Sequence, residues 1–269
     1  MTSGRDYSTI SPSAKALLMV RAQTGLPYAR AAAEMLWGPE AVRAAELESN
    51  ASPGAGLRRR HFEVRATSID HALDALGARN VLEIAAGLSF RGLAMAARPG
   101  VSYLDTDLPG IADIKADLAA RLHPGPLSGS LRIRALDALD PTAFRGAVAE
   151  LPAGPICVVH EGLLMYLDDA EKRRLAASVR HALAERGGAW VTADVYVKSE
   201  APVYREERTR RFIERHRVDE NKFEDWDAAA AFFASCGFDI ANGTPRSDDP
   251  WGVRETWVLE ARRTGDAHR

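Results

Sequence analysis

The spacing of hydrophobic residues along this chain changes near residue 80. Before that point it is helical, first in residues 12–48 and then in residues 57–76, with a loop expected at residues 50–56. The second helical stretch carries one apolar stripe, formed by Phe62, Ile69, Leu73 and Leu76. From residue 80 onward, short apolar runs alternate with helical patterns. The sequence therefore predicts a helical N-terminal part followed by alternating strands and helices.

Five short apolar runs are predicted to be strands: residues 81–84, 102–107, 131–135, 155–160 and 189–195. Helical patterns separate them, ending near residue 97 and covering residues 109–122, 143–149 and 168–184. Strands that alternate with helices form a parallel sheet with helices on both faces. The predicted fold class is therefore α/β.

The last quarter of the chain departs from this alternation. Residues 200–217 form a highly charged helical pattern inserted between a strand and the next helix, at residues 225–235. That helix leads into Gly-Phe and is followed by two final apolar runs, the second at residues 255–261. These two runs are predicted to form a hairpin.

Composition and charge narrow the classes of ligand. The chain has 269 residues, 46% of them hydrophobic, which is enough for one large domain with a complete core. Its 35 Lys and Arg against 37 Asp and Glu give a net charge of -2, so no overall field attracts nucleic acid or an anionic membrane. No uncharged apolar run of about 18 residues occurs, and the first residues lack the apolar segment of a signal peptide. We expect a cytoplasmic protein with a small-molecule ligand.

The two cysteines agree with a reducing compartment. Cys157 lies in an apolar run and Cys236 near a helix end, without the spacing of a redox or metal motif. We expect both to be small core residues and expect no metal site.

Residues 80–91 combine a predicted strand, a turn of small residues and the start of a helix. The strand carries Glu83 and the turn carries Gly87, while Ala85 and Ser89 stand where glycine is more common. Small residues in such a turn allow a close approach of the backbone to a ligand. An ordinary buried strand with a tight turn is the alternative.

Polar residues follow each of the first four predicted strands. After Glu83 and Gly87 come the pairs Asp105 and Asp107, Asp137 and Ala138, and His160 and Glu161. In an open parallel sheet, ligands bind beyond the carboxyl ends of the strands. Gly87 and Asp107 are about 20 residues apart, the separation at which such folds place a carboxylate on ribose hydroxyls. One such acid alone can be a helix cap, but four together favour a nucleotide-type site.

Three motifs resemble the leucine carboxyl methyltransferase family, particularly its bacterial polyketide O-methyltransferases: residues 84–91, residues 103–109 and His-Glu-Gly-Leu-Leu-Met-Tyr-Leu at 160–167. The resemblance implies a Rossmann-like class I fold with a seven-stranded, mostly parallel sheet, and S-adenosylmethionine (SAM) as cofactor. It also implies one domain over residues 1–269, in four parts: a helical cap (1–56), a SAM-binding core (57–199), a lid insertion (200–222) and the end of the sheet (223–269).

The resemblance assigns cofactor contacts by position. Arg65 matches the arginine that holds the carboxylate of SAM, and it heads an apolar stripe, where an unpaired guanidinium would be costly. Lys15 matches a lysine near the same group, although a surface lysine fits as well. The remaining contacts are Glu83 and Gly87 near the methionine portion, Asp107 or Asp105 on the ribose, Asp137 with Ala138 at the adenine, and Glu161 at the floor of the site.

The methyl acceptor is less well determined. A carboxylate, with a pKa near 4, is ionised at pH 7, whereas a phenol near 10 needs a base. His160 is the only histidine at a predicted strand end, so the sequence favours a carboxylate acceptor and leaves a hydroxyl acceptor with His160 as base as the alternative. Tyr28, Tyr204 and Arg208 are the candidate acceptor contacts, the last two on the inserted helix. Two rival classes are a catalytically inactive SAM-binding regulator and a dinucleotide dehydrogenase, of which the glycine-poor turn disfavours the second.

Overall fold

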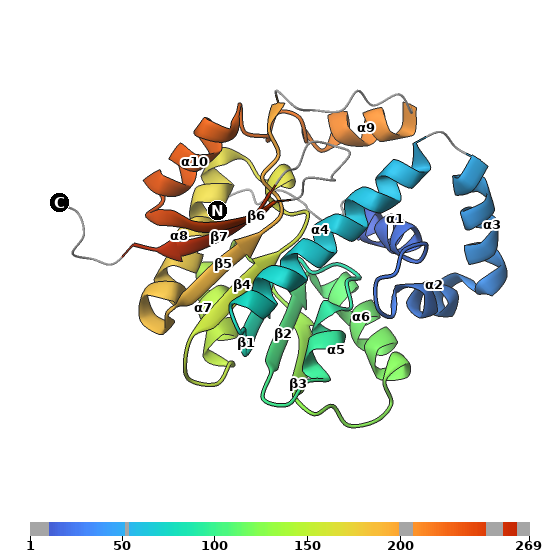
Figure 1. The fold of residues 1–269 in the computed structure, drawn as a ribbon, viewed down its shortest axis with the longest axis horizontal. Helices are drawn as coiled ribbons and strands as arrows, with labels where there is room; N and C mark the ends of the chain where they lie inside the picture. The colour runs from blue at the N-terminus through green and yellow to red at the C-terminus, as the bar shows by residue number, and fades with distance from the viewer. Residues whose placement is uncertain (1–10, 52–53, 199–206, 246–254, 263–269) are drawn as a thin grey trace.

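The computed structural model describes residues 11–51, 54–198, 207–245 and 255–262, which form a sheet covered on both faces by helices (Figure 1). The seven strands lie in the order β3-β2-β1-β4-β5-β7-β6. Five are parallel: β1 (Asn80–Glu83), β2 (Ser102–Asp107), β3 (Ser130–Ala135), β4 (Ile156–His160) and β5 (Gly188–Thr192). β6 (Phe238–Pro245) and β7 (Glu255–Ala261) are antiparallel to each other, and β7 is antiparallel to β5. The predicted α/β class, seven strands and final hairpin are confirmed.

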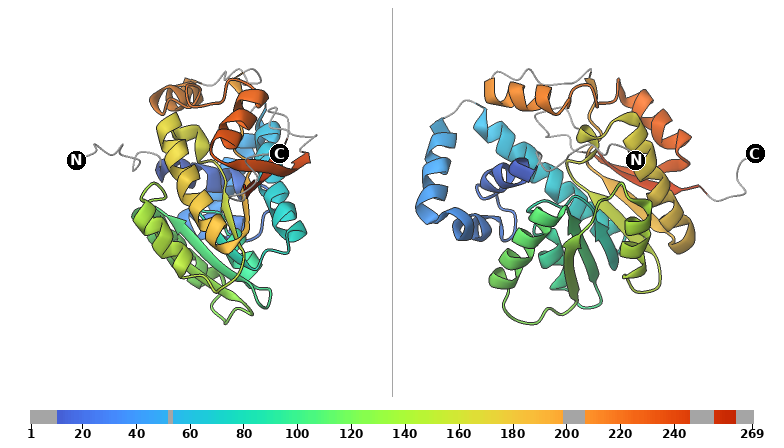
Figure 2. Two further views of the ribbon diagram at one scale, coloured as in Figure 1. Left: turned by 90° about the vertical axis from the view of Figure 1, so that its left-hand side faces the viewer. Right: turned by 180° about the vertical axis from the view of Figure 1, so that it is seen from behind.

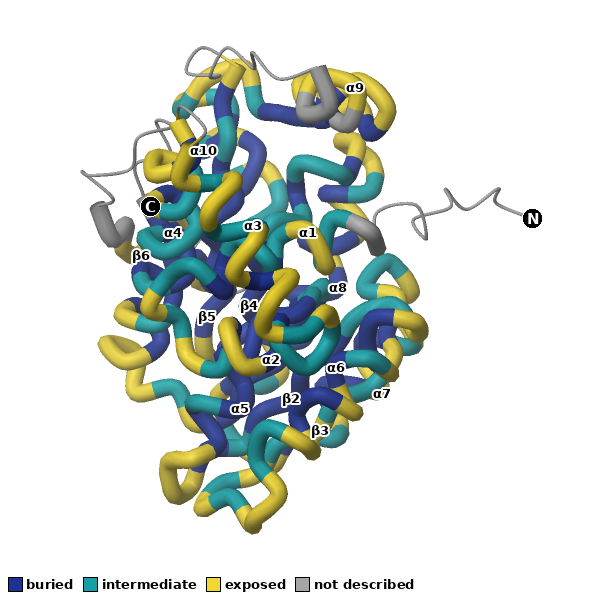
Figure 3. The backbone as a smooth tube through the Cα atoms, turned by 90° about the vertical axis from the view of Figure 1, so that its right-hand side faces the viewer, coloured by how far each residue is buried: buried dark blue, intermediate teal, exposed yellow. Residues whose placement is uncertain are grey.

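The two faces of the sheet are covered by different helices (Figure 2). α4 (Ala55–Ala75) and α5 (Arg91–Ala96) pack with the alternate strand residues that include Val81 and Tyr103. α7 (Pro141–Ala149), α8 (Asp169–Arg186) and α10 (Trp226–Ser235) pack with the opposite set, which includes Leu82 and Trp190. Because successive strand residues point to opposite faces, the continuous apolar runs of β1 and β4 supply both layers. Figure 3 shows β2, β4 and β5 as mostly buried strands, whereas β3, at one edge of the sheet, is intermediate or exposed along its length.

The N-terminal helices lie beside the β1–β2–β3 half of the sheet (Figure 1). α1 (Ser11–Arg21), α2 (Ala29–Trp37) and α3 (Pro39–Ala51) share an apolar cluster with α5 and with α6 (Pro109–Leu122). α1 passes over the turn after β1, since a Cβ built on Gly87 would lie 3.7 Å from Cβ of Ala14. The cap thereby brings the end of α1 to the carboxyl ends of the strands.

The inserted segment is closed at its base by backbone contacts. The N–H of Lys198 donates to the carbonyl of Phe223 at 2.8 Å, and the N–H of Phe223 donates to the carbonyl of Tyr196 at 3.0 Å. Within the insertion, α9 (Glu207–Arg215) lies in the predicted helix of residues 200–217, whose first residues, 200–206, lie outside the described part of the chain. Tyr204 lies outside the described residues, and so does the side chain of Arg208. Their predicted contact with the acceptor therefore stays a prediction.

None of the helices in the described residues has the length and apolar character needed to cross a membrane. The same residues contain no group of His, Cys, Asp and Glu side chains arranged to hold a metal ion.

Candidate active site

The polar strand ends meet where the order of the strands reverses. Along the chain, strands are added from β1 to β3 on one side, and then from β4 onward on the other. The carboxyl ends of β1 and β4 are therefore adjacent, with Glu83 ending β1 and Glu161 following β4. Such a switch point is the usual ligand crevice of an open parallel sheet.

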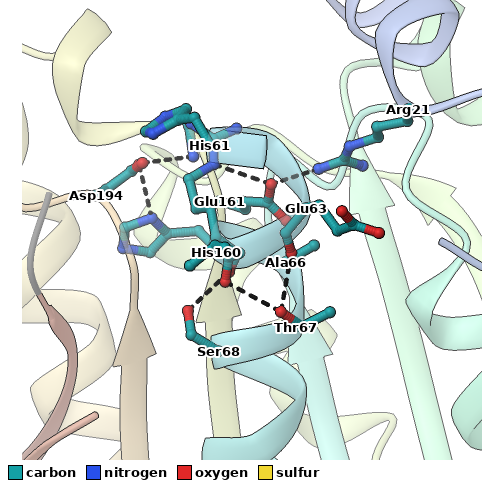
Figure 4. A network of polar contacts seen from close by, with 12 residues as sticks. Arg21, His61, Glu63, Ala66, Thr67, Ser68, His160, Glu161 and Asp194 are labelled. Atoms are coloured by element: carbon teal, nitrogen blue, oxygen red, sulfur yellow. Dashed lines mark hydrogen bonds and ion pairs between the residues drawn. The ribbon is translucent and has the colours of Figure 1, made fainter. Parts of the chain in front are cut away.

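Glu161 is buried among three arginines from three helices, and Figure 4 shows one of them, Arg21, beside Glu161. Its Oε1 accepts hydrogen bonds from Arg21 Nη2 at 2.5 Å and Arg65 Nε at 3.0 Å, and its Oε2 accepts one from Arg91 Nη2 at 2.9 Å. Burial opposes ionisation, but the positive charges of Arg21, Arg65 and Arg91 outweigh it and hold the pKa of Glu161 well below its usual value. The acid is thus a fixed carboxylate at the end of β4.

Arg91 links Glu161 to the acid of β1. It donates to Glu83 through Nη1 and to Asp70 through Nε, the latter at 2.5 Å. Tyr103 completes the environment of Glu83 by donating its hydroxyl proton at 2.6 Å. Glu83 is completely buried, with both oxygens bound by these neighbours. Glu83 thus holds Arg91 in this structure, and its predicted contact with the cofactor stays a prediction.

Arg65 has the acidic partner that its position on the apolar stripe required. That partner is Glu161, and a second contact runs from Arg65 Nη1 to the hydroxyl of Tyr196 at 2.9 Å. Its remaining terminal nitrogen, Nη2, lies 3.3 Å from where a Cβ on Gly162 would stand. Gly162 has a φ of 79°, a left-handed conformation that glycine adopts without strain. Glycine at this position therefore suits both the turn and the guanidinium beside it.

The end of β2 is joined to the turn after β1. Asp107 Oδ2 accepts the N–H of Gly87 at 2.6 Å, and its Oδ1 accepts the N–H of Leu108 at 2.7 Å. Burial raises the pKa of Asp107, and these two hydrogen bonds oppose the shift. Gly87 and Ala85 both have positive φ, 55° and 49°. The turn thus has the conformation of a glycine-rich loop although Ala85 carries a side chain.

Asp105, the alternative ribose contact, is buried and bound elsewhere. Its Oδ1 accepts a hydrogen bond from Lys115 Nζ of α6 at 2.6 Å, and both side chains are about fully enclosed. This ion pair holds α6 against the sheet. Asp107 is the more exposed of the two acids, and the assignment of the ribose to Asp107 or Asp105 stays a prediction.

The other predicted cofactor contacts lie at the edges of this cluster. Asp137 follows β3, is exposed, and accepts the N–H of Leu139 at 2.9 Å, while Ala138 is half-buried. Lys15 is exposed on α1, the helix that covers the Gly87 turn. Tyr28, a predicted acceptor contact, instead packs into the apolar cluster of the N-terminal helices.

His160 does not have the position of an acceptor-facing base. Its side chain is 0% exposed, Nδ1 lies 3.2 Å from Asp194 Oδ2, and the ring centroid is 5.6 Å from that of Trp190. A base must reach the proton that it removes, and this structure encloses the His160 ring; the assignment of His160 as base stays a prediction that this burial does not favour. Arg21, Arg91, Asp194 and Tyr196 are site residues that the sequence interpretation did not single out.

Comparison with known proteins agrees with this geometry. Residues 7–180, well over half of the chain, match the family model described as leucine carboxyl methyltransferase. A protein of Mycobacterium sp. (strain KMS), classed as an S-adenosyl-L-methionine-dependent methyltransferase, is 26% identical over 212 residues, covering 74% of this chain and 69% of the relative.

One solved structure shares the fold. The crystal structure of TnmH is 16% identical, with a TM-score of 0.52 over 94% of this chain and 70% of TnmH. LepI in complex with SAH is 14% identical, with a TM-score of 0.46 over 69% of this chain, which spans only 43% of LepI. With the match to the family model, the strand order and the acids at the strand ends, the chain belongs to the leucine carboxyl methyltransferase family, whose members use SAM as cofactor.

Proposed function

We propose that this chain transfers the methyl group of SAM to a carboxylate of a small acidic molecule. The observation that carries the proposal is the cluster of Glu161 with Arg65 and Arg91 at the switch point of the sheet, one strand away from the Gly87–Asp107 contact. Membership of a carboxyl methyltransferase family supports the acceptor class. Polyketide-like and other secondary-metabolite acids are the first acceptors to test.

The residues present fit the cofactor. An amino-acid end needs a carboxylate for its ammonium group and a guanidinium for its carboxylate, and Glu161 and Arg65 offer these side by side. Asp107, fixed by the N–H of Gly87, would hold the ribose hydroxyls. Asp137 and Ala138, at the end of the neighbouring strand, would hold the adenine.

The chemistry requires little acid–base help from the protein. When bound, SAM supplies a methyl group activated by its sulfonium sulfur. A carboxylate acceptor is already ionised at pH 7, so no proton has to be removed before its lone pair attacks. The protein's part is to align the acceptor and to exclude water, which competes for the methyl group. The burial of His160 fits this acceptor because no base is then needed at the end of β4.

A hydroxyl acceptor is the second candidate, and one contact favours it. Nε2 of His61 lies 3.1 Å from the hydroxyl of Tyr196, which also accepts a hydrogen bond from Arg65. A histidine and a tyrosine in contact beside the cofactor cluster can relay a proton away from a phenol.

The acceptor classes are separated by the product. Purified protein is incubated with SAM carrying a labelled methyl group and a panel of carboxylic acids and phenols, and products are analysed by mass spectrometry. A labelled product that mild alkali hydrolyses is a methyl ester, as proposed. A product that resists alkali is an ether and favours the second candidate. Saturable SAM binding without turnover on any member of the panel favours an inactive regulator and contradicts the proposed activity.

A further inference from the structure

Asp194, two residues beyond β5, holds the turn that follows β4. Its carboxylate accepts three successive backbone N–H groups, from Gly162 on Oδ1 at 2.6 Å and from Leu163 and Leu164 on Oδ2, the latter at 3.0 Å. His160 Nδ1 approaches the same Oδ2 at 3.2 Å. Figure 4 shows Asp194 beside His160. The side chain of Asp194 therefore accepts the backbone N–H groups of the turn immediately after Glu161.

The position of Asp194 makes these contacts strong. The side chain is completely buried, where charged hydrogen bonds are weakened little by solvent. Burial alone would raise the pKa of Asp194, but the hydrogen bond and charge of His160, the charge of Arg65 and the backbone donors lower it to about 2. Asp194 is therefore a carboxylate at neutral pH.

The turn of residues 162–164 directly follows Glu161 and lies against Arg65, the two residues to which we assign the amino-acid end of the cofactor. Glu161 precedes it and places both oxygens among the arginines, while Gly162 brings its backbone against Arg65 Nη2. A movement of the turn would shift Glu161 relative to Arg65 without changing either side chain. Alignment matters at this scale, because a displacement of about 1 Å in a site can cost about 100-fold in rate.

We propose that Asp194 is a positioning residue that fixes the Gly162–Leu164 turn and, through it, holds Glu161 in place for the amino-acid end of the cofactor. This inference rests on the proposed binding of SAM at Glu161. His160 has a supporting part: its ring orients the Asp194 carboxylate and does not meet the acceptor. A purely structural Asp194 would stabilise the fold and leave the affinity of the folded protein for SAM unchanged.

The test compares Asp194→Asn with a control that removes a buried polar contact at the amino ends of the strands. Asn80→Ala serves as the control, since it breaks the 3.2 Å hydrogen bond from Asn80 Nδ2 to the carbonyl of Pro155, at the start of β1 and just before β4. The dissociation constants of SAM and SAH are measured by calorimetry below the melting temperature of each variant. Hydrogen exchange of the peptide covering residues 161–166 is measured without cofactor.

For Asp194→Asn we expect at least about tenfold weaker SAM binding, faster exchange in residues 162–164, and a larger change in KM for SAM than in kcat. For Asn80→Ala we expect lower stability with SAM affinity within about twofold of wild type. Unchanged SAM affinity in a folded Asp194→Asn variant overturns the inference.

If Asp194→Asn does not fold, His160→Gln carries the test, because it removes the ring contact and leaves the three backbone contacts. We expect a several-fold loss of SAM affinity in this variant, and unchanged affinity overturns the inference. Failure of the wild-type protein to bind SAM is a different result: it contradicts the proposed function, and this inference falls with it.

Discussion

Replacing Glu161 by glutamine tests the acid at the centre of the arginine cluster. Glutamine keeps the size of the side chain and one carbonyl oxygen but removes the charge that faces Arg21, Arg65 and Arg91. In the part of the chain that the structure describes, Arg21 has no other acidic partner, whereas Arg91 keeps Glu83 and Asp70. The substitution therefore leaves buried positive charge without compensation.

The magnitude follows from that loss. Removing one partner of a buried ion pair costs about 3–5 kcal/mol, a large part of the ~5–15 kcal/mol that stabilises an ordinary domain. With a urea dependence of about 3 kcal/mol per molar, the unfolding midpoint should fall by on the order of 1 M. The control is Glu185→Gln, an exposed acid paired with His181 on α8, for which we expect a loss below about 1 kcal/mol.

The dependence on pH has a definite sign. The folded-state pKa of Glu161 is held well below the value of about 4.3 in an unfolded chain, so its stabilisation is complete above that value and is lost as the pH falls further. The difference between wild type and Glu161→Gln should therefore be largest near neutral pH and shrink below about pH 4.

The result of urea unfolding decides whether the reasoning holds. A loss no larger than that of Glu185→Gln would refute the argument that Glu161 compensates buried arginines. If Glu161→Gln is too unstable to measure, Arg21→Met in the same background should recover part of the stability, because it removes one uncompensated guanidinium. No recovery in the double variant would contradict the assigned charge balance.

Three further predictions concern single residues. Ala85→Gly relieves a left-handed alanine, so urea unfolding should show unchanged or higher stability, by up to about 1 kcal/mol, and a clear loss would contradict the strained turn. Arg208→Ala should raise the KM for the acceptor and leave SAM affinity unchanged if the inserted helix is a lid; identical kinetics would identify it as a solvated surface. Burial lowers the pKa of Lys172 to about 8, so the charged side chain costs stability at low pH and the free energy of unfolding should rise between about pH 8 and 10.5. Lys172→Met should remove this rise in stability, and urea unfolding with an unchanged pH profile in the variant would contradict the prediction.

The order of helices and strands could be predicted from the spacing of apolar residues and from the Gly and Pro residues that separate the elements. The strand ranges 102–107 and 255–261 and the helix range 109–122 coincide with β2, β7 and α6. The predicted and observed elements differ at their ends. β5 ends at Thr192, and two residues later Asp194 binds the turn after β4. α4 begins at Ala55, inside the expected loop of residues 50–56. Helix ends depend on local contacts that periodicity does not report.

The sequence predicted the acidic residues of the site but not the basic residues with which they form ion pairs. Arg21 and Glu161 are 140 residues apart, and no local pattern indicates that they meet. For Lys115 a signal exists, because it stands on the apolar stripe of α6 with Ile111 and Leu118, where a charge requires a partner. Asp105 and Asp107 share one face of β2, so spacing could not tell which of them a helix would cover.

Calorimetric titration with SAM tests the central claim most directly. The account predicts saturable binding of about one SAM per chain, no comparable binding of NAD, and weaker SAM binding by about 1–3 kcal/mol in each of Asp107→Ala and Arg65→Ala, because each loses a charged hydrogen-bonding group. Wild-type affinity in both variants would contradict the assignment of the cofactor site to the ends of β1, β2 and β4.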